Sequence, residues 1–132
     1  MQMKLELVPI PASDVDRAKA FYVDKVGFHL DHDVQPGNGM RVIQLTPPGS
    51  SCSILLGTGM GEISDMKPGS IKGLHLVVAN VGKAREALIS RGVDVGEIVA
   101  YPDGIKFAGF SDPDGNSWTF QELPQRAAEF RE

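Results

Sequence analysis

The chain has 132 residues, of which 42% are hydrophobic and 23% are charged. This length can bury one good core but not two ordinary independent domains, and the near-average composition excludes disordered and fibrous classes. A formal net charge of -4, with scattered Lys and Arg, argues against binding to phosphate backbones or anionic membrane surfaces, so we expect neither nucleic acid nor a membrane as partner.

The sequence shows no feature of a membrane-inserted or exported protein. It lacks the run of about 18 apolar residues that a membrane helix needs, and Met1 to Glu6 has neither the basic nor the apolar region of a signal peptide. The single Cys52 cannot form an intramolecular disulfide, which fits a reducing compartment. We therefore expect a cytoplasmic protein whose partner is a small organic molecule.

The first residues in chain order predict a strand followed by a helix. An apolar run from Leu7 to Ala12 leads to Asp14, whose side chain can accept hydrogen bonds from the free N–H groups at a helix start. Apolar residues then recur at helical spacing, at Val15, Ala18, Phe21 and Tyr22. Gly27 predicts the end of this helix. Three strand-like runs separated by turn residues follow, at 28–33, 40–46 and 53–56.

The same order of residue classes returns in the second half. Residues 73–92 match residues 7–26, with Asn80 as the capping residue and Gly92 as the final glycine. The later strand-like runs are 93–100, 105–111 and 117–122. We predict the following boundaries: module 1 at about 4–57, a Gly/Ser-rich linker at about 58–70, module 2 at about 71–123, and a tail at 124–132 that forms a short helix or is frayed.

Two βαβββ copies predict an α+β fold. The string from Ser13 to Tyr22 followed by Gly27-Phe28 resembles the entry motif of the vicinal oxygen chelate (VOC) superfamily of glyoxalases, bleomycin-resistance proteins and dioxygenases. Asp112 to Asn116 resembles the closing turn of that family. Together the motifs cover nearly the whole chain. The resemblance implies that residues 1–132 are a single VOC domain, whose paired modules form a curved mixed sheet around a cavity with the helices on the convex side.

The resemblance also indicates where a metal would be bound. Relatives that hold a divalent metal take His, Glu or Gln ligands from the first and last strands of each module. The matching positions in this chain are Leu7, Ile54, Gly73 and Thr119, none of which is a suitable donor. We therefore expect no metal cofactor. The alternative is a divalent metal held by ligands that this alignment misplaces.

Residues expected to face the cavity are mostly apolar with a few polar groups. In the last strand, Trp118 and Phe120 alternate with polar residues and should pack under the helices. The residues that alternate with the helix-facing ones should point into the cavity. They form the predicted ligand-binding set: Leu7, Pro9, His75, Val77, Ser117, Thr119 and Gln121. Arg41 and Gln44 lie three residues apart in one predicted strand, so their side chains point to opposite faces and only one of them can face inward. Gln44 is the candidate for binding a carbonyl or amide.

The predicted function is binding of a small, largely apolar organic molecule without a metal, as bleomycin-resistance-type relatives sequester drugs. A metal-dependent lyase, isomerase or dioxygenase of the same superfamily is the alternative. If chemistry occurs without a metal, His75 is the candidate general acid or base, because histidine exchanges protons near neutral pH. The resemblance further implies a homodimer.

Overall fold

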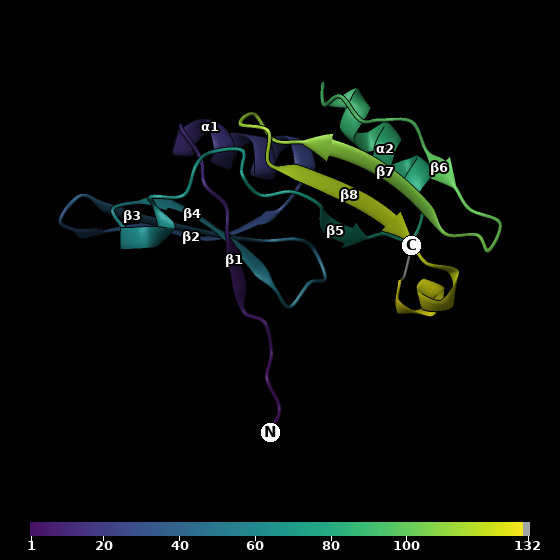
Figure 1. The fold of residues 1–132 in the computed structure, drawn as a ribbon, viewed down its shortest axis with the longest axis horizontal. Helices are drawn as coiled ribbons and strands as arrows, with labels where there is room; N and C mark the ends of the chain where they lie inside the picture. Colours follow the sequence, from purple (N-terminus) through teal and green to yellow (C-terminus); the bar gives the residue numbers. More distant parts are fainter. Residues whose placement is uncertain (131–132) are drawn as a thin grey trace. The chain divides into compact units, whose positions relative to one another are not determined.

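The computed structural model describes residues 1–130 as two copies of one strand and helix order (Figure 1). The first copy contains β1 (Leu7–Pro9), α1 (Val15–Ala20), the π-helical η1 (Phe21–Val26), β2 (His29–Gly37), β3 (Met40–Thr46) and β4 (Ser53–Thr58). The short 3₁₀ helix η2 (Gly61–Ile63) follows. The second copy contains β5 (Leu74–Val77), α2 (Val81–Ser90), β6 (Val99–Ala100), β7 (Lys106–Ser111) and β8 (Ser117–Glu122), followed by the 3₁₀ helix η3 (Pro124–Glu129).

The strands form two four-stranded mixed sheets, in the orders β1-β4-β3-β2 and β5-β8-β7-β6. In each sheet the first strand is parallel to the last one of its module, and the other pairs are antiparallel. This confirms the α+β class and the paired βαβββ modules. The chain divides into two compact units: unit 1 contains Met1–Ile71 and Asp112–Asn116, and unit 2 contains Lys72–Ser111 and the described part of Ser117–Glu132.

Both helices begin directly after the predicted caps; Gly27 follows η1 directly, whereas α2 ends at Ser90, two residues before Gly92. The Asp14 carboxylate accepts a hydrogen bond from Arg17 N at 3.0 Å, and the Asn80 side chain accepts one from Lys83 N at 2.9 Å. The helix in unit 1 continues through η1 and stops where Gly27 N and Phe28 N both donate to Tyr22 O. Gly27 has φ 94°, a left-handed conformation that glycine adopts without strain.

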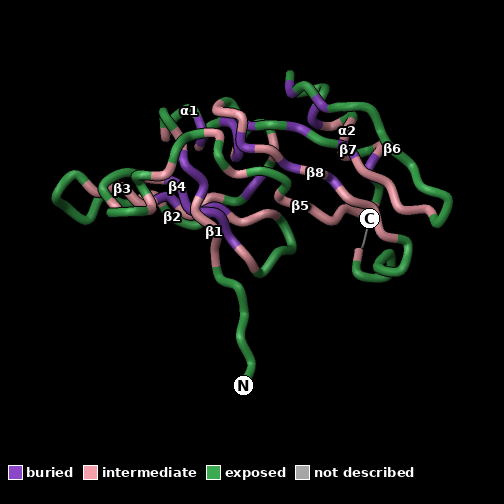
Figure 2. Tube along the Cα trace, in the orientation of Figure 1, coloured by how far each residue is buried: buried purple, intermediate pink, exposed green. Residues whose placement is uncertain are grey.

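The core of each unit lies between the sheet and its helix. In unit 1, Ile43, Leu45 and Leu56 have no exposed surface, and Ala18 of α1 and Tyr22 of η1 are buried as well. In unit 2 the core includes Ala108, Phe110, Trp118 and Phe120 from the sheet, with Val81 and Leu88 from α2. Figure 2 shows buried and half-buried residues alternating along β8. The prediction that Trp118 and Phe120 pack under a helix is confirmed.

The strand predicted at 93–100 is wrong for most of its length, because only Val99 and Ala100 pair with β7. Val93 and Val95 are buried as an extended strand would bury them, and Gly96 N donates to Gly109 O. The Arg85 guanidinium, however, donates to the carbonyl oxygens of Val95 and Gly96 at 3.4 and 2.8 Å. The Arg85 side chain therefore binds backbone carbonyl oxygens that would otherwise accept hydrogen bonds from a neighbouring strand.

The predicted linker and the predicted tail each contain a short 3₁₀ helix. The predicted linker contains η2, and the predicted tail forms η3, with exposed residues from Pro124 to Glu129. The last two residues of the tail lie outside the described residues. Within residues 1–130 no helix is long and apolar enough to cross a bilayer.

Candidate functional site

Each sheet has one face against its helix and an opposite face, which we call the open face. In unit 1, strand pairing places Leu7 beside Ser53, Pro9 beside Leu55, and Leu55 beside Gln44 on the open face. Leu7, Pro9 and Gln44 are all half-buried. The predicted ligand-binding residues of module 1 therefore share one surface, on which Leu7 and Pro9 are apolar and Gln44 is polar.

The structure decides between Arg41 and Gln44. Arg41 lies on the helix face, where its guanidinium donates to both oxygens of Asp33 at 3.1 and 2.9 Å and contacts Asp16 at 2.8 Å. Lys19 Nζ of α1 adds a bond to Asp33 at 2.8 Å. These cations hold the pKa of Asp33 well below its usual range, mainly through the hydrogen bonds from Arg41 and then Lys19. Arg41 is thus held in a structural ion-pair network, and Gln44 remains on the open face.

Acid should weaken this ion-pair network. Because the folded state lowers the pKa of Asp33, the carboxylate stabilises the fold above the unfolded pKa of about 4 and loses that contribution as pH falls below it. Asp33→Asn is expected to lower the free energy of unfolding at pH 7 by about 1 kcal/mol. Urea unfolding between pH 7 and pH 2 should show this difference shrinking in acid. Asp24→Asn, an exposed change on η1, is the control. A difference that stays constant down to pH 2 would contradict the assignment.

A bulge in β2 changes which residues face outward. Simple alternation predicts His29, Asp31 and Asp33 on one face and His32 on the other. Instead the register shifts between Leu30 and His32, so His32 lies beside Gln44 while Asp33 lies beside Ile43. The extra residue, Asp31, accepts a hydrogen bond from Thr46 Oγ1. The predicted alternation is therefore wrong, because the bulge rotates Asp31 and His32 onto the same face.

The open face of unit 1 carries a row of polar contacts. Gln44 Nε2 donates to Ser53 Oγ at 3.2 Å, and Ser53 Oγ lies 2.6 Å from Thr46 Oγ1. Thr46 in turn contacts Asp31. Ser53 is only 5% exposed, so the centre of this row is shielded from water. Of these residues, only Gln44 was predicted from the sequence. Asp31 was missed because the bulge leaves no clear local signal, and Thr46 and Ser53 because their contact depends on the pairing of β3 with β4.

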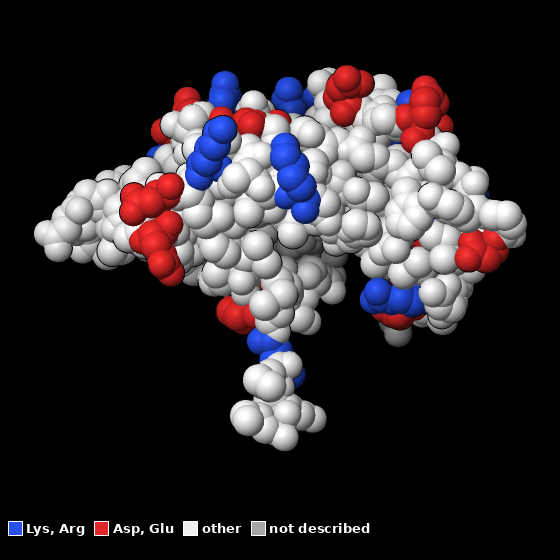
Figure 3. Space-filling model, in the orientation of Figure 1, with Lys and Arg blue, Asp and Glu red and all other residues white. Residues whose placement is uncertain are grey.

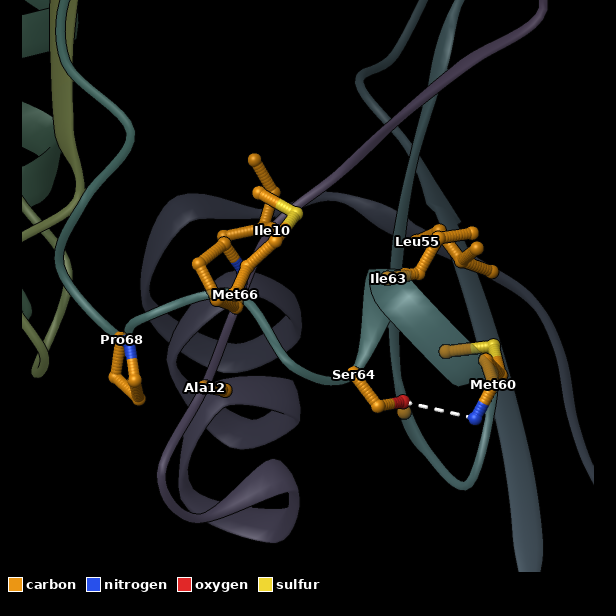
Figure 4. A pocket seen from close by; sticks show the side chains of 10 residues that line it. Ile10, Ala12, Leu55, Met60, Ile63, Ser64, Met66 and Pro68 are labelled. Carbon is orange, nitrogen blue, oxygen red and sulfur yellow. Dashed lines mark hydrogen bonds between the residues drawn. The ribbon is translucent and has the colours of Figure 1, made fainter.

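A small hollow lies where the linker passes over the end of β4 (Figure 4). Its volume is ≈ 80 Å³, and its lining includes Ile10, Leu55, Met60, Ile63 and Met66. Drug-sized ligands occupy about 300 to 1,000 Å³, so this hollow can take only one small group of such a molecule. A second hollow of ≈ 270 Å³ lies at the glycine-rich β2–β3 turn.

The open face of unit 2 collects the remaining predicted residues. Pairing places His75 beside Thr119 and Val77 beside Gln121, and Ser117 lies on the same side of β8. His75 is exposed and the other four are half-buried. Two residues that the sequence analysis missed complete the surface: Phe107 beside Gln121 and Gly109 beside Thr119. Gly109 leaves a patch of exposed backbone between polar and aromatic side chains.

The His75 ring is held in one orientation. Its Nδ1 lies 2.7 Å from Gly73 O, and its ring packs edge-on against Phe107 with centroids 6.1 Å apart. Tyr101 makes a second edge-on contact with Phe107 at 5.7 Å. Because a carbonyl oxygen only accepts, Nδ1 carries the proton and Nε2 of the neutral ring is an acceptor. His75 can therefore accept a proton or a hydrogen bond at Nε2.

The predicted metal positions need one correction. Pro9 pairs with Leu55 as His75 pairs with Thr119, so Leu55 rather than Ile54 corresponds to Thr119. Ile54 lies beside Leu45 on the helix face. Leucine has no donor atom, so the corrected set does not fit a divalent ion either. In the described part of the chain, no group of three or more His, Cys, Asp or Glu side chains could hold a metal ion.

The Asp112–Asn116 turn belongs to unit 1 and has a structural role. Asp112 Oδ2 accepts from Tyr22 Oη at 2.7 Å and from Asn116 Nδ2 at 2.8 Å. Asp112 Oδ1 accepts from the backbone N–H groups of Asp114 and Asn116 at 3.0 and 2.9 Å. Asn116 Nδ2 also donates to Pro11 O at 2.9 Å. This buried cluster holds the turn against η1 and the segment after β1.

The surface charges form no extended basic region on the face shown in Figure 3, where Lys and Arg are interspersed with Asp and Glu. The net charge is -4. This distribution gives no electrostatic support for a nucleic-acid interface.

Comparison with known proteins shows similarity along almost the whole chain. The family model described as Glyoxalase/Bleomycin resistance protein/Dioxygenase superfamily matches residues 4–120. The structure of TnmS3, an antibiotic binding protein from Streptomyces sp. CB03234, is 36% identical, covers 92% of this chain and 96% of that chain, and has a TM-score of 0.78. No match was found among curated proteins.

Two further solved structures are similar at comparable levels. A glyoxalase/bleomycin resistance protein from Streptomyces sp. CB03234 is 38% identical over 89% of this chain and 98% of that chain, with a TM-score of 0.75. A glyoxalase/bleomycin resistance protein/dioxygenase superfamily member from Sphaerobacter thermophilus DSM 20745 is 30% identical over 92% of this chain and 98% of that chain, with a TM-score of 0.79.

Proposed function

Because this chain belongs to the Glyoxalase/Bleomycin resistance protein/Dioxygenase superfamily, we propose that it binds a small, largely apolar organic molecule without a metal ion. The observation that carries this proposal is the similarity to an antibiotic binding protein over nearly the full length of both chains. The open faces offer the surfaces for such a ligand. Cytoplasmic location and assembly as a homodimer remain predictions.

The chemistry of the open faces supports this proposal. Leu7, Pro9 and Leu55 in unit 1, and Val77 and Phe107 in unit 2, provide apolar contact area. A few polar groups interrupt these surfaces, as in sites that bind organic molecules and orient them by single hydrogen bonds. The predicted groups among them are Gln44, His75, Ser117, Thr119 and Gln121.

His75 has a specific part in the proposed site. Its Nδ1 donates to Gly73 O, so Nε2 can accept a hydrogen bond from a ligand hydroxyl or N–H group. Phe107 supports the ring and adds aromatic surface. In the alternative, catalytic function, the same Nε2 would act as the general base.

Metal content and ligand binding should be measured on the same untagged protein, purified without chelators. We expect no stoichiometric metal, and we expect bleomycin or a planar aromatic compound to raise the melting temperature. A ligand that binds only the folded state adds about 2.7 kcal/mol at 100 times its Kd. About one metal ion per chain, lost together with a lyase or dioxygenase activity in His75→Ala, would instead identify a metal enzyme.

A single substitution can connect the binding to the open face of unit 2. A Cβ at Gly109 would meet only Trp118 O, at 3.5 Å, which is ordinary contact. Gly109→Val therefore adds a branched side chain beside Thr119 whose Cβ makes only ordinary contact with the sheet. We expect it to weaken a ligand of this face at least about tenfold, or by about 1.4 kcal/mol, with little change in the stability of the free protein. Unchanged affinity would exclude this face as the site.

A further inference from the structure

The polar row on the open face of unit 1 joins two residues that do not contact each other, Gln44 and Asp31. The contacts run from Gln44 Nε2 to Ser53 Oγ, from Ser53 Oγ to Thr46 Oγ1, and from Thr46 Oγ1 to Asp31. All four residues belong to unit 1, on β2, β3 and β4. The two hydroxyl groups in the middle each have one proton, so each can donate only one hydrogen bond.

The carboxylate at one end sets the direction of every bond in the row. A carboxylate only accepts, so the Thr46 hydroxyl donates its proton to Asp31. Thr46 Oγ1 must then accept from Ser53, which uses the only proton of Ser53. Ser53 Oγ therefore accepts from Gln44, and this requires the nitrogen of the Gln44 amide, not its oxygen, to face Ser53.

The Gln44 carbonyl oxygen is consequently left with both lone pairs free, and Nε2 keeps one N–H group beyond the one it donates to Ser53. The Gln44 side chain makes no other hydrogen bond within residues 1–130. No side-chain nitrogen or oxygen in this part of the chain is both buried and without a partner, so the oxygen reaches solvent. Nε2 has already used one N–H group, whereas both lone pairs of the oxygen are free.

We propose that Gln44 selects ligands that present a hydrogen-bond donor, such as a phenolic hydroxyl, and that Asp31 is a positioning residue that imposes this choice through Thr46 and Ser53. This inference rests on the proposed function, since it concerns the ligand of the same open face. Hydrogen bonds aligned in one direction also polarise each other, which strengthens the acceptor at the far end. A ligand carboxylate that faces the Gln44 oxygen is repelled, and only the one remaining N–H group of Nε2 could bind it.

The direction of the row can be tested without any ligand. NMR of the Gln44 side-chain amide should be compared in the wild type, Asp31→Asn and Thr46→Val. Both substitutions should shift the Gln44 amide resonances, because the first allows the row to reverse and the second interrupts it. Thr58→Val is the matched control, since Thr58 Oγ1 donates to Gly39 O outside the row. Unchanged Gln44 resonances in Asp31→Asn would overturn the coupling.

Ligand selection is tested with a matched pair of probes, 2-naphthol and 2-methoxynaphthalene, which differ in one donated proton. We expect the wild type to prefer 2-naphthol about tenfold, the effect of one good hydrogen bond. In Asp31→Asn the ratio of the two affinities should fall to near one. The introduced amide can donate to Thr46, so the hydroxyl groups can reverse their direction and the Gln44 amide is free to turn.

The outcomes separate this inference from the proposed function. A merely structural role of Asp31 predicts that both probes weaken by the same factor in Asp31→Asn, and that result would overturn the selection by Gln44. If neither probe nor any other organic molecule binds the wild type, the proposed function fails and the selection with it. The ligand-free NMR comparison would still establish or refute the direction of the row.

Discussion

Replacing Asp112 by asparagine is expected to lower the free energy of unfolding by about 3 kcal/mol. The two side chains have nearly the same shape, but the Asp112 carboxylate accepts four hydrogen bonds, two from backbone N–H groups and two from the side chains of Tyr22 and Asn116. An asparagine amide would turn an NH₂ group toward two of these donors. Asp112 is 5% exposed, so water cannot compensate. Urea unfolding at pH 7 measures the loss.

Two further variants separate the loss of the hydrogen bonds of Asp112 from the mere loss of one negative charge. Asp65→Asn removes the same charge from an exposed residue of unit 1 and should change the stability by less than about 0.5 kcal/mol. Tyr22→Phe removes one of the four donors and should cost about 1 kcal/mol. If Asp112→Asn were as mild as the Asp65 change, the cluster would not hold the turn in place.

Adding a single methyl group at Gly57 is expected to destabilise unit 1 by about 3 kcal/mol or more. A Cβ at this position would lie 2.0 Å from Arg41 O and 2.7 Å from Met60 Cε. The methionine end can move aside, but the carbonyl oxygen belongs to the backbone of β3. Gly57→Ala must therefore displace β3 from β4. Thermal unfolding should show a lower melting temperature, and the chemical shifts of β3 and β4 should change.

Gly109→Ala is the matched control for this prediction. Gly109 is also a strand glycine, and neither residue has the positive φ that strains other side chains. A methyl group on Gly109 would have Trp118 O as its nearest neighbour, at 3.5 Å, so the substitution should be nearly neutral. Equal melting temperatures for the two variants would show that β3 and β4 tolerate a side chain at Gly57.

Local signals explain why the helices were predicted with good boundaries. The caps at Asp14 and Asn80 act on backbone groups three residues away, and the glycine at 27 adopts a left-handed turn. These interactions are complete within a few residues of sequence, so no tertiary contact is needed to recognise them. The alternation in β8 is equally local, because successive side chains of a strand must point to opposite faces.

The candidate site was predicted only in part. The open-face positions of His75, Val77, Ser117, Thr119 and Gln121 follow from alternation in two regular strands. The position equivalent to Thr119 in module 1 was misplaced by one residue, because the turn before β4 offered a weak anchor for the alignment. Phe107 and Gly109 were missed because their importance depends on the strands beside them.

The sequence alone is enough to predict the duplicated βαβββ order, the helix caps and the faces of β5 and β8, since these features depend on residues close together in the chain. Contacts between strands set the rest: Arg41 turns to Asp33, and Asp31 joins the open face because a bulge shifts the register between β2 and β3. The same holds for Gly57 and Gly109, which are both strand glycines. What separates them is the distance to a backbone atom of a neighbouring strand, and folding alone sets that distance.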